Sequence, residues 1–225
     1  MPAMLLAAGR GERMGTLSMR LPKALLRVGG RALIEHHLTA LAGAGVSEVV
    51  VNTARLGPLI RASLGDGRRY GLRIRYSNEG KQPLETAGGI VQALPLLGPE
   101  FLVVNADVWT DFDFRALRPA QSSLAHLVLV DNPSHHPQGD FALQGERLNN
   151  GMEARLTYAG IGIFRAELFA GLPAAPTPLA PLLRSAADAG RATGQRHSGA
   201  WLDVGTAERL AQLRKRLASR HGANR

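Results

Sequence analysis

The chain has 225 residues, no cysteine and a formal net charge of +9, because 27 Lys and Arg residues outnumber 18 Asp and Glu residues. A chain of this length in which 45% of the residues are hydrophobic can bury a substantial core, which excludes a disordered polymer. The lack of cysteine excludes disulfides, thiolate metal sites, iron–sulfur clusters and a cysteine nucleophile. No stretch approaches the roughly 20 apolar residues of a membrane span, and the N-terminus lacks the pattern of a signal peptide, so we expect a cytoplasmic protein.

The positive charge suggests a nucleic-acid partner as one hypothesis, which the distribution of the charge can test. The basic residues are scattered except for a group near the C-terminus, which comprises Arg214, Lys215, Arg216, Arg220 and Arg225. No aromatic residues alternate with this group, and the sequence has neither a helix-turn-helix pattern nor zinc-finger spacing. We therefore expect neither a nucleic-acid nor a membrane partner, and a polyanionic small substrate is a better use for the charge.

Strand and helix patterns alternate from the N-terminus onward. Residues 3–7 form a short apolar run that leads into a glycine-rich turn, as expected for a buried strand. The next expected elements, in chain order, are a helix over 34–45, a strand over 48–52, a helix over 56–64, a strand over 72–76, a helix over 86–94 and a strand over 101–105. Nearly continuous apolar residues in the strands are typical of parallel strands that are covered on both faces.

These strand–helix units predict a Rossmann-like α/β fold, an open and mostly parallel sheet with helices on both faces. Ligands of such sheets bind outside the carboxyl ends of the strands, and this edge is expected to carry Gly9, Gly11, Asn52, Glu79 and Asp107. After residue 125 the strand patterns follow one another without helices, at 126–131, 140–144 and 155–164, and predict a small antiparallel extension. A proline-containing connection over 173–181 and helices over 179–189 and 206–217 complete the chain.

The segment after the first strand carries the strongest chemical signal. It reads LAAGRGERM and is followed by Leu21, Pro22 and Lys23. Glycines allow backbone N–H groups to approach phosphate oxygens closely, and Arg13 and Lys23 supply the positive charge that a triphosphate needs. Neither the P-loop spacing GxxxxGK[ST] nor the Rossmann spacing GxGxxG is present, so the segment predicts neither a Walker-type ATPase nor a dinucleotide enzyme.

This segment resembles the signature of the sugar-phosphate nucleotidyltransferases, which join a nucleoside triphosphate to a sugar 1-phosphate. The resemblance continues in the family's order and spacing at residues 85–89 (ETAGG), 104–107 (VNAD) and 201–206 (WLDVGT). Within this family, the stretches at 125–141 and 108–114 look like the N-acetylmuramate α-1-phosphate uridylyltransferases of cell-wall recycling. The resemblance implies a single domain over 1–225 with the nucleotide-diphospho-sugar transferase fold, in which 1–115 mainly binds the nucleotide and 116–225 mainly binds the sugar.

The resemblance also implies which residues form the site. UTP is expected to bind at Ala7, Ala8, Gly9, Gly11, Glu12, Arg13, Lys23, Gly88 and Asn105, and the sugar phosphate at Glu79, Asp140, Glu153 and Gly160. Asp107 and Asp203 are expected to hold one Mg²⁺ together, because Mg²⁺ prefers few carboxylates and completes its shell with water and phosphate oxygens. Alternatively, each aspartate is a helix cap, although Thr206 is the better cap for the last helix, and Glu79 and Asp140 could equally be loop carboxylates.

The implied reaction needs no general base, because a sugar 1-phosphate with a second pKa of about 6 is largely ionised at neutral pH. Its oxygen attacks the α-phosphorus of UTP while pyrophosphate leaves in line, and the protein supplies charge neutralisation and alignment. The expected catalytic residues are Arg13 at the β- and γ-phosphates, Lys23 at the α-phosphate and the incoming phosphate, and Asp107 at the metal.

Three alternative functions stay open from the sequence. The first is the same chemistry on mannose or glucose 1-phosphate with GTP, UTP or dTTP. The second is a non-catalytic regulator that binds sugar nucleotides, and the third is a nucleic-acid binder that uses the basic C-terminus. A zinc site built from His126, His135 and His136 is not expected, because adjacent histidines in a proline-containing loop are more often surface residues.

Overall fold

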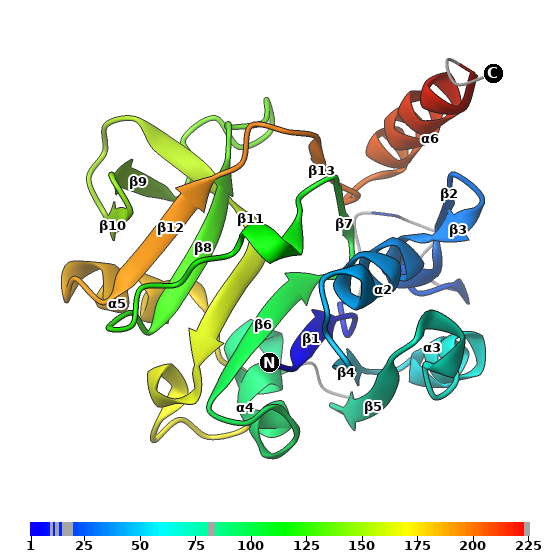
Figure 1. The fold of residues 1–225 in the computed structure, drawn as a ribbon, viewed down its shortest axis with the longest axis horizontal. Helices are drawn as coiled ribbons and strands as arrows, with labels where there is room; N and C mark the ends of the chain where they lie inside the picture. The colour runs from blue at the N-terminus through cyan, green and yellow to red at the C-terminus, as the bar shows by residue number, and fades with distance from the viewer. Residues whose placement is uncertain (10, 12–13, 15–19, 81–83, 223–225) are drawn as a thin grey trace.

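A computed structural model describes the chain except for residues 10, 12–13, 15–19, 81–83 and 223–225 (Figure 1). Its first half contains a parallel sheet in the order β5-β4-β1-β6, which we call the parallel half. The strands are β1 (Ala3–Leu6), β4 (Glu48–Thr53), β5 (Arg73–Asn78) and β6 (Glu100–Asn105), and the helices are α2 (Leu33–Gly43), α3 (Gly57–Leu64) and α4 (Glu85–Leu97). The predicted strand–helix alternation and the parallel pairing are confirmed.

Helices cover both faces of the parallel half, as predicted. Alternate residues of one strand point to opposite faces, so Leu5 of β1 packs in the hydrophobic cluster that holds α2 and α3, whereas Met4 packs in the cluster that holds α4. The same alternation divides Val49 and Val51 from Val50 in β4. Burial on both faces explains why the sequence pattern of these strands is a continuous apolar run.

The second half of the sheet is closed on itself, which corrects the prediction of an open sheet. From β6 the sheet continues as β11-β8-β12-β10-β9, and β9 also pairs with β11, so these five strands form a ring that we call the closed half. The strands are β8 (Ala125–Val130), β9 (Phe141–Gln144), β10 (Arg147–Asn149), β11 (Arg155–Arg165) and β12 (Ala192–Arg196). The closed half is mixed, because β11 is antiparallel to β6 and β8 whereas β12 is parallel to β8.

The closure depends on the length and the bend of β11. Arg155 and Leu156 at its start pair with β9, and Thr157 and Tyr158 pair with β8. The residues from Ile161 onward pair with β6, and β8 pairs again from Gly162, after a register shift between Tyr158 and Gly162. A β-bulge of this kind bends a strand and increases its twist. Strand β12 was not predicted because its sequence, ATGQR, shows no alternation of apolar and polar residues.

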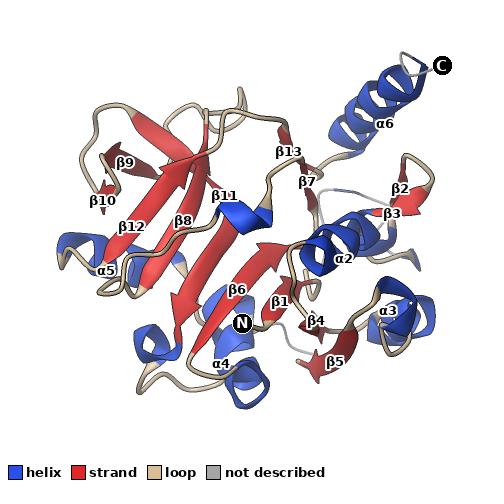
Figure 2. Cartoon of the chain, in the orientation of Figure 1, coloured by secondary structure: helices blue, strands red, loops and turns tan. Residues whose placement is uncertain are grey.

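A third unit brings together segments from the early, middle and last parts of the chain (Figure 2). Its elements are β2 (Arg27–Val28), β3 (Arg31–Ala32), β7 (Val108–Thr110), β13 (Trp201–Asp203) and α6 (Ala207–Gly222), and the 3-10 helix η2 (Lys23–Leu25) lies nearby in sequence. Strand β13 pairs with β7, and Leu210, Leu213 and Leu217 of α6 pack in a hydrophobic cluster with Trp109 of β7. This unit brings the segment around Asp203 to the segment around Asp107.

The remaining elements lie at the periphery or connect the main ones. They are α5 (Ala180–Asp188) and the 3-10 helices η3 (Arg68–Tyr70), η4 (Phe114–Ala116) and η5 (Ala166–Phe169). Helix α5 packs in the same hydrophobic cluster as α4. Among the described residues, no helix is both long enough and apolar enough to span a membrane.

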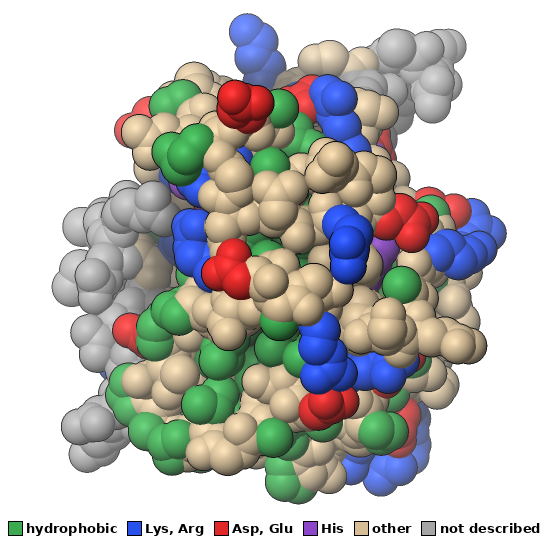
Figure 3. Space-filling model, turned by 90° about the vertical axis from the view of Figure 1, so that its left-hand side faces the viewer, with side chains coloured by type: hydrophobic (Ala, Val, Ile, Leu, Met, Phe, Trp, Pro, Cys, Tyr) green, Lys and Arg blue, Asp and Glu red, His purple; other side chains and the backbone are tan. Residues whose placement is uncertain are grey.

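The basic residues do not form one continuous surface on the face shown in Figure 3, where acidic and hydrophobic side chains separate the described Lys and Arg residues. Several arginines are paired locally with carboxylates, for example Arg69 with Glu35 at 3.1 Å and Arg191 with Glu167 at 3.0 Å. Exposed pairs of this kind contribute little to stability. Several arginines are therefore surface charges with a local partner.

Candidate active site

A cleft of about 240 Å³ lies at the carboxyl ends of the strands of the parallel half. Its lining comprises Leu6, Ala7, Ala8, Gly9, Lys23, Ala24, Asn52, Glu79, Glu85, Thr86, Asn105, Ala106 and Asp107. Leu6 ends β1 and is in register with Asn52 on one neighbouring strand and with Asn105 on the other. Parallel strands that end together thus deliver two amide side chains to one edge, where ligands of open α/β sheets bind.

The glycine-rich segment enters this cleft at its start. Ala7, Ala8 and Gly9 line the cleft, and a Cβ atom added to Gly9 would meet no atom within 4 Å. Gly11 is buried and has a φ of 69°, a conformation that glycine adopts without strain. Glu12 and Arg13 lie outside the described residues, so their predicted contacts with UTP stay predictions.

A buried chain of hydrogen bonds fixes the floor of the cleft. The Ala7 N–H donates to Asn52 Oδ1 at 2.6 Å, and Asn52 Nδ2 donates to Glu79 Oε1 at 2.6 Å. Glu79 Oε2 accepts from the Leu84 N–H at 2.9 Å. Glu79 was predicted to face the sugar, but both of its oxygens bond the protein, and they connect β4 to the start of α4.

The start of α4 needs glycines for packing rather than for ligand access. A Cβ atom at Gly88 would overlap the carbonyl oxygen of Ala175, and the Ala87 and Gly88 N–H groups donate to the carbonyl of Thr177. Gly88 therefore receives the proline-containing connection and does not line the cleft, although it was predicted to contact the nucleotide. Thr86 and Glu85 line the cleft instead, and the φ of 56° at Glu85 is unusual for a residue with a side chain.

Lys23 and Asp107 face each other across the cleft. Lys23 Nζ lies 3.3 Å from Asp107 Oδ2, and the exposed fractions of the two side chains are 12% and 37%. Asp107 directly precedes β7, whose Val108 carbonyl accepts a 2.7 Å hydrogen bond from His37 of α2. Burial lowers the pKa of His37 from 6.5 to about 4, so the neutral imidazole donates through Nε2 and holds this strand in place.

The second predicted metal ligand, Asp203, lies next to Asp107. Asp203 is opposite Val108 in the β13–β7 pair, and the Val204 N–H donates to the Asp107 carbonyl at 2.7 Å. Among the described residues no group of three or more His, Cys, Asp and Glu side chains gathers as a metal site. Two carboxylates fit Mg²⁺, which keeps several waters and takes phosphate oxygens, better than an ion that needs a full protein cage.

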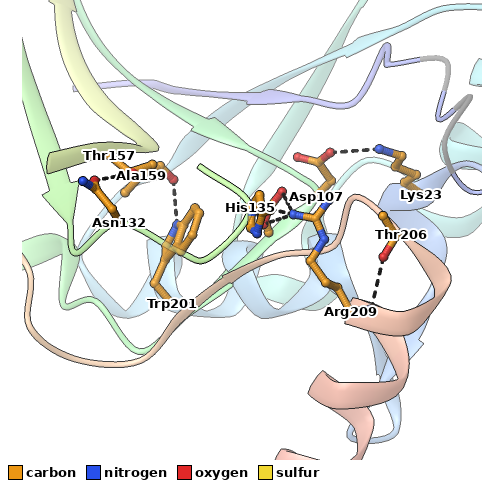
Figure 4. A network of polar contacts seen from close by, with 10 residues as sticks. Lys23, Asp107, Asn132, His135, Thr157, Ala159, Trp201, Thr206 and Arg209 are labelled. Atoms are coloured by element: carbon orange, nitrogen blue, oxygen red, sulfur yellow. Dashed lines mark hydrogen bonds and ion pairs between the residues drawn. The ribbon is translucent and has the colours of Figure 1, made fainter. Parts of the chain in front are cut away.

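Each of these carboxylates already has a cationic partner (Figure 4). Arg209 Nη1 donates to both oxygens of Asp203 and to His135 Nε2, and His135 Nε2 lies 3.1 Å from Asp203 Oδ1. The Arg209 N–H bonds the Thr206 hydroxyl at 3.3 Å, which confirms Thr206 as the cap of α6. Positive groups of the protein thus occupy the carboxylate oxygens that a divalent cation would use.

Besides Glu79, the residues predicted for the sugar lie in or beside the closed half. Asp140 accepts from His136 at 3.1 Å and from the Tyr158 N–H at 2.8 Å, and burial raises the pKa of Tyr158 above its ordinary value. Gly160 lies in the bulge of β11 with a φ of 72°, and a Cβ atom there would overlap the side chain of Asn105. Glu153 is exposed in the turn between β10 and β11.

Comparison with known proteins identifies the family. Residues 2–141 match the Nucleotidyl transferase family. The chain is 51% identical over 224 residues to the N-acetylmuramate alpha-1-phosphate uridylyltransferase of Neisseria meningitidis serogroup B, a match that covers 94% of this chain and 96% of the relative. The chain belongs to the nucleotidyl transferase family.

Two further comparisons extend this result. A relative from Caulobacter vibrioides with the same name is 36% identical, and the match covers 96% of each chain. A Bacillus anthracis crystal structure assigned to glucose-1-phosphate thymidylyltransferase has a TM-score of 0.83 at 18% identity, covering 96% of this chain and 95% of that one. The second similarity shows that the fold is shared.

Sequence reasoning gave no role to several residues that shape the site of this nucleotidyl transferase. Asn52 was expected at the correct edge but without a function, and Arg209 and His37 were not singled out. The signal for Asn52 is its position at the end of a buried strand, as for Asp107. His126 is buried and bonds Thr193 and Gln195 at 2.9 Å each, a structural role that the sequence did not reveal.

Proposed function

We propose that this nucleotidyl transferase transfers UMP from UTP to N-acetylmuramate α-1-phosphate, giving UDP-N-acetylmuramate and pyrophosphate, as a step of cell-wall recycling. The observation that carries this proposal is the 51% identity to a relative of that name over 94% of the chain. The cleft at the ends of β1, β4 and β6 supports it, because it combines open backbone at Gly9 with a lysine and a carboxylate. A nucleoside triphosphate substrate is consistent with a cytoplasmic location.

The nucleotide binds mainly through residues 1–115 and the sugar mainly through 116–225, which we treat as halves of one domain. In this arrangement the base and ribose lie against Ala7, Ala8, Gly9 and Asn105, whose positions along the cleft support the assignment. Asp140 and Gly160 position the sugar indirectly, because Asp140 fixes the loop between β8 and β9 and Gly160 permits the bend of β11. Glu153 is retained as a sugar contact from the resemblance alone.

Asp107 and Asp203 are proposed to hold Mg²⁺, which would neutralise charge on the substrate phosphates. The backbone of Asp203 lies opposite Val108 and bonds Asp107 through the Val204 N–H, and this proximity supports the assignment. Lys23 is proposed to grip the α-phosphate and the incoming phosphate, since its ammonium group already lies within the cleft. Arg13, in the segment after Gly11, is proposed to stabilise the departing β- and γ-phosphates.

The reaction then depends on alignment and electrostatics, because the attacking phosphate oxygen is already ionised and needs no base. The rigid floor formed by Asn52 and Glu79 holds the first loop in place, which reduces the movement needed when the substrates bind. The same chemistry on mannose or glucose 1-phosphate is the nearest alternative. A regulator that binds sugar nucleotides without turnover is the alternative of another class.

A pyrophosphate-release assay tests these functions directly. Each of UTP, GTP, CTP and dTTP is combined with N-acetylmuramate, mannose and glucose 1-phosphates in the presence of Mg²⁺. We expect the highest kcat/KM for UTP with N-acetylmuramate 1-phosphate. Turnover confined to another sugar phosphate would overturn the substrate assignment, and binding of sugar nucleotides with no turnover in any combination would favour the regulator.

A further inference from the structure

Arg209 is a buried cation that the reaction described above does not use. Its side chain is 12% exposed and projects from the first turn of α6 to the carboxylate of Asp203. Lys23, the partner of Asp107, has a role in phosphate binding, whereas Arg209 pairs with the other proposed metal ligand. A guanidinium group thus pairs with a carboxylate that is proposed to bind Mg²⁺.

The contacts of Arg209 are directed at the metal-binding atoms themselves. Nη1 donates to both carboxylate oxygens of Asp203 and, at 2.7 Å, to His135 Nε2 in the loop between β8 and β9 (Figure 4). A carboxylate with both oxygens bonded to a guanidinium group offers a divalent cation fewer free lone pairs. A metal ion that binds Asp203 therefore competes with Arg209 for this carboxylate in the arrangement that the structure shows.

Gly205 provides the space for this guanidinium group. A Cβ atom at Gly205 would overlap Arg209 Nη2, lie 3.0 Å from Arg209 Cζ and lie 3.3 Å from Asp203 Oδ2. Gly205 is not among the described glycines with a positive φ, so its backbone does not require glycine. Glycine at this position therefore leaves the space in which the Arg209 guanidinium group contacts Asp203.

The backbone of Arg209 is fixed by the packing and the cap of its helix. Leu210 and Leu213 pack in the hydrophobic cluster beneath α6, and the Arg209 N–H is bonded to Thr206 at the helix cap. Release of Asp203 therefore requires rotation of one long side chain and no movement of the helix. In the metal-free protein, the same contact neutralises the charge of the Asp203 carboxylate.

We propose that Arg209 is a resident counter-cation of Asp203 that competes with Mg²⁺ for this carboxylate and so sets the metal affinity of the free enzyme. The proposal rests on the proposed function through the assignment of Asp203 as a metal ligand. It predicts that removal of the guanidinium group strengthens metal binding. A residue that held Asp203 in place for the metal would give the opposite result.

The test measures binding of Mn²⁺, used as a paramagnetic substitute for Mg²⁺, to the free full-length protein by electron paramagnetic resonance. We expect Arg209→Gln to lower the dissociation constant of Mn²⁺ by about tenfold, because a cation in contact with the ligand is removed. Gly205→Ala should lower it by a smaller factor, since it displaces the guanidinium group but keeps the charge nearby. The matched control is Arg214→Gln on the same helix, α6. It removes an exposed guanidinium group that donates to the Arg27 carbonyl of β2, and it should leave the dissociation constant of Mn²⁺ unchanged.

Thermal unfolding provides a second readout that turnover does not influence. Without metal, Arg209→Gln should lower the melting temperature relative to the wild type, because Asp203 loses its counter-cation. Saturating Mg²⁺ should reduce this difference, since the ion takes over the neutralisation of Asp203. A difference that persists unchanged in Mg²⁺ would contradict the proposal.

The two proposals fail in distinguishable ways. Asp203→Asn should weaken Mn²⁺ binding strongly in both the wild-type and the Arg209→Gln backgrounds, and unchanged binding would overturn the metal assignment together with the role of Arg209. If Asp203→Asn weakens binding but Arg209→Gln leaves the dissociation constant equal or raises it, the metal assignment stands and the competition is refuted.

Discussion

In the parallel half of the sheet, Asn52 and Asn105 flank Leu6 at the strand ends and line the cleft, whereas in the closed half Asp140 uses both carboxylate oxygens on its own loop and strand. Parallel strands bring their carboxyl ends to one edge, so a polar residue there faces a ligand as a consequence of topology. In the ring of five strands, polar side chains such as Asp140 instead form hydrogen bonds that fix the loops and the bent strand. The comparison indicates that the closed half contributes mainly shape, and the parallel half mainly charged and hydrogen-bonding groups.

The largest effect is expected at the end of the parallel half. Asp107→Asn should reduce kcat/KM on the order of 10³-fold, because it removes a carboxylate proposed to hold the Mg²⁺ that neutralises the substrate phosphates. Its free energy of unfolding should change by less than about 1 kcal/mol, since the pair with Lys23 is partly exposed. Steady-state kinetics with varied Mg²⁺ and urea unfolding measure both quantities. Asp113→Asn, at an exposed cap of η4, is the matched control, and wild-type turnover of Asp107→Asn would refute the metal assignment.

Substitutions at two glycines, Gly88 and Gly9, distinguish a glycine needed for packing from one needed for access of the ligand. Gly88→Ala should lower the free energy of unfolding by about 3 kcal/mol, because the new Cβ atom meets the Ala175 carbonyl. Gly9→Ala should change stability by less than about 0.5 kcal/mol, since no atom lies within 4 Å, but should reduce kcat/KM for UTP because its methyl group enters the cleft. Urea unfolding and turnover are compared for the pair. Loss of stability at Gly9 with full activity would reverse the assignment.

The floor of the cleft should respond to loss of its central amide. Asn52→Ala leaves the Ala7 N–H and a carboxylate oxygen of Glu79 without their partner, so it should cost about 2 kcal/mol of unfolding free energy. Because Ala7 lines the cleft proposed to bind the nucleotide, KM for UTP should rise as well. Calorimetry and initial rates provide the two values. An increase of KM for the sugar phosphate alone would place Asn52 on the other side of the cleft.

His37 gives the parallel half a pH dependence. Burial lowers its pKa to about 4, so below pH 6.5 the unfolded chain binds a proton that the folded protein does not bind. The contribution of neutral His37 to the free energy of unfolding is fully present above pH 6.5 and is lost as the pH falls toward 4. At pH 5 about 2 kcal/mol of it has been lost. His37→Gln, which keeps a donor for the Val108 carbonyl, should make the decline between pH 7 and pH 5 shallower by that amount. An unchanged decline in urea unfolding would exclude His37 as its cause.

The smallest effect is expected in the closed half. Asn132 bonds the Pro137 and Arg155 carbonyls at 3.0 Å each and accepts from Thr157 at 2.8 Å, and it thereby fixes the loop that carries His135 and His136. Asn132→Ala should cost about 1 kcal/mol of unfolding free energy. KM for the sugar phosphate should rise a few-fold while KM for UTP stays at the wild-type value. A larger rise in KM for UTP would show that the two halves are not separable in this way.

The same difference explains how much of the fold was predictable. Strands β1, β4 and β6 are buried on both faces and therefore appear in the sequence as apolar runs with glycine-containing turns between the elements. Strand β12 and the pairing of β9 with β11 have no such signature, because they depend on contacts between residues far apart in the chain. The open sheet was a correct prediction for the first half and a wrong one for the second.

The position of residues in the cleft was predictable where a motif follows a strand end, as at Gly9 after β1 and Asp107 after β6, and Lys23 of the motif also lines the cleft. It was not predictable where one side chain is satisfied by another that is distant in sequence. Glu79 bonds Asn52 and the Leu84 N–H, and Arg209 reaches both Asp203 and His135. These partners are determined by the packing of β4, α4 and α6, which the sequence does not show residue by residue.

Phosphorus NMR of the complete reaction tests the central claim most directly. The protein is incubated with UTP, N-acetylmuramate 1-phosphate and Mg²⁺, and the phosphorus signals are followed with time. We predict that the signals of UTP and the sugar phosphate decline together while those of pyrophosphate and a nucleoside diphosphate sugar grow in equal amounts. Unchanged UTP, or pyrophosphate formed with UMP while the sugar phosphate persists, would contradict the account.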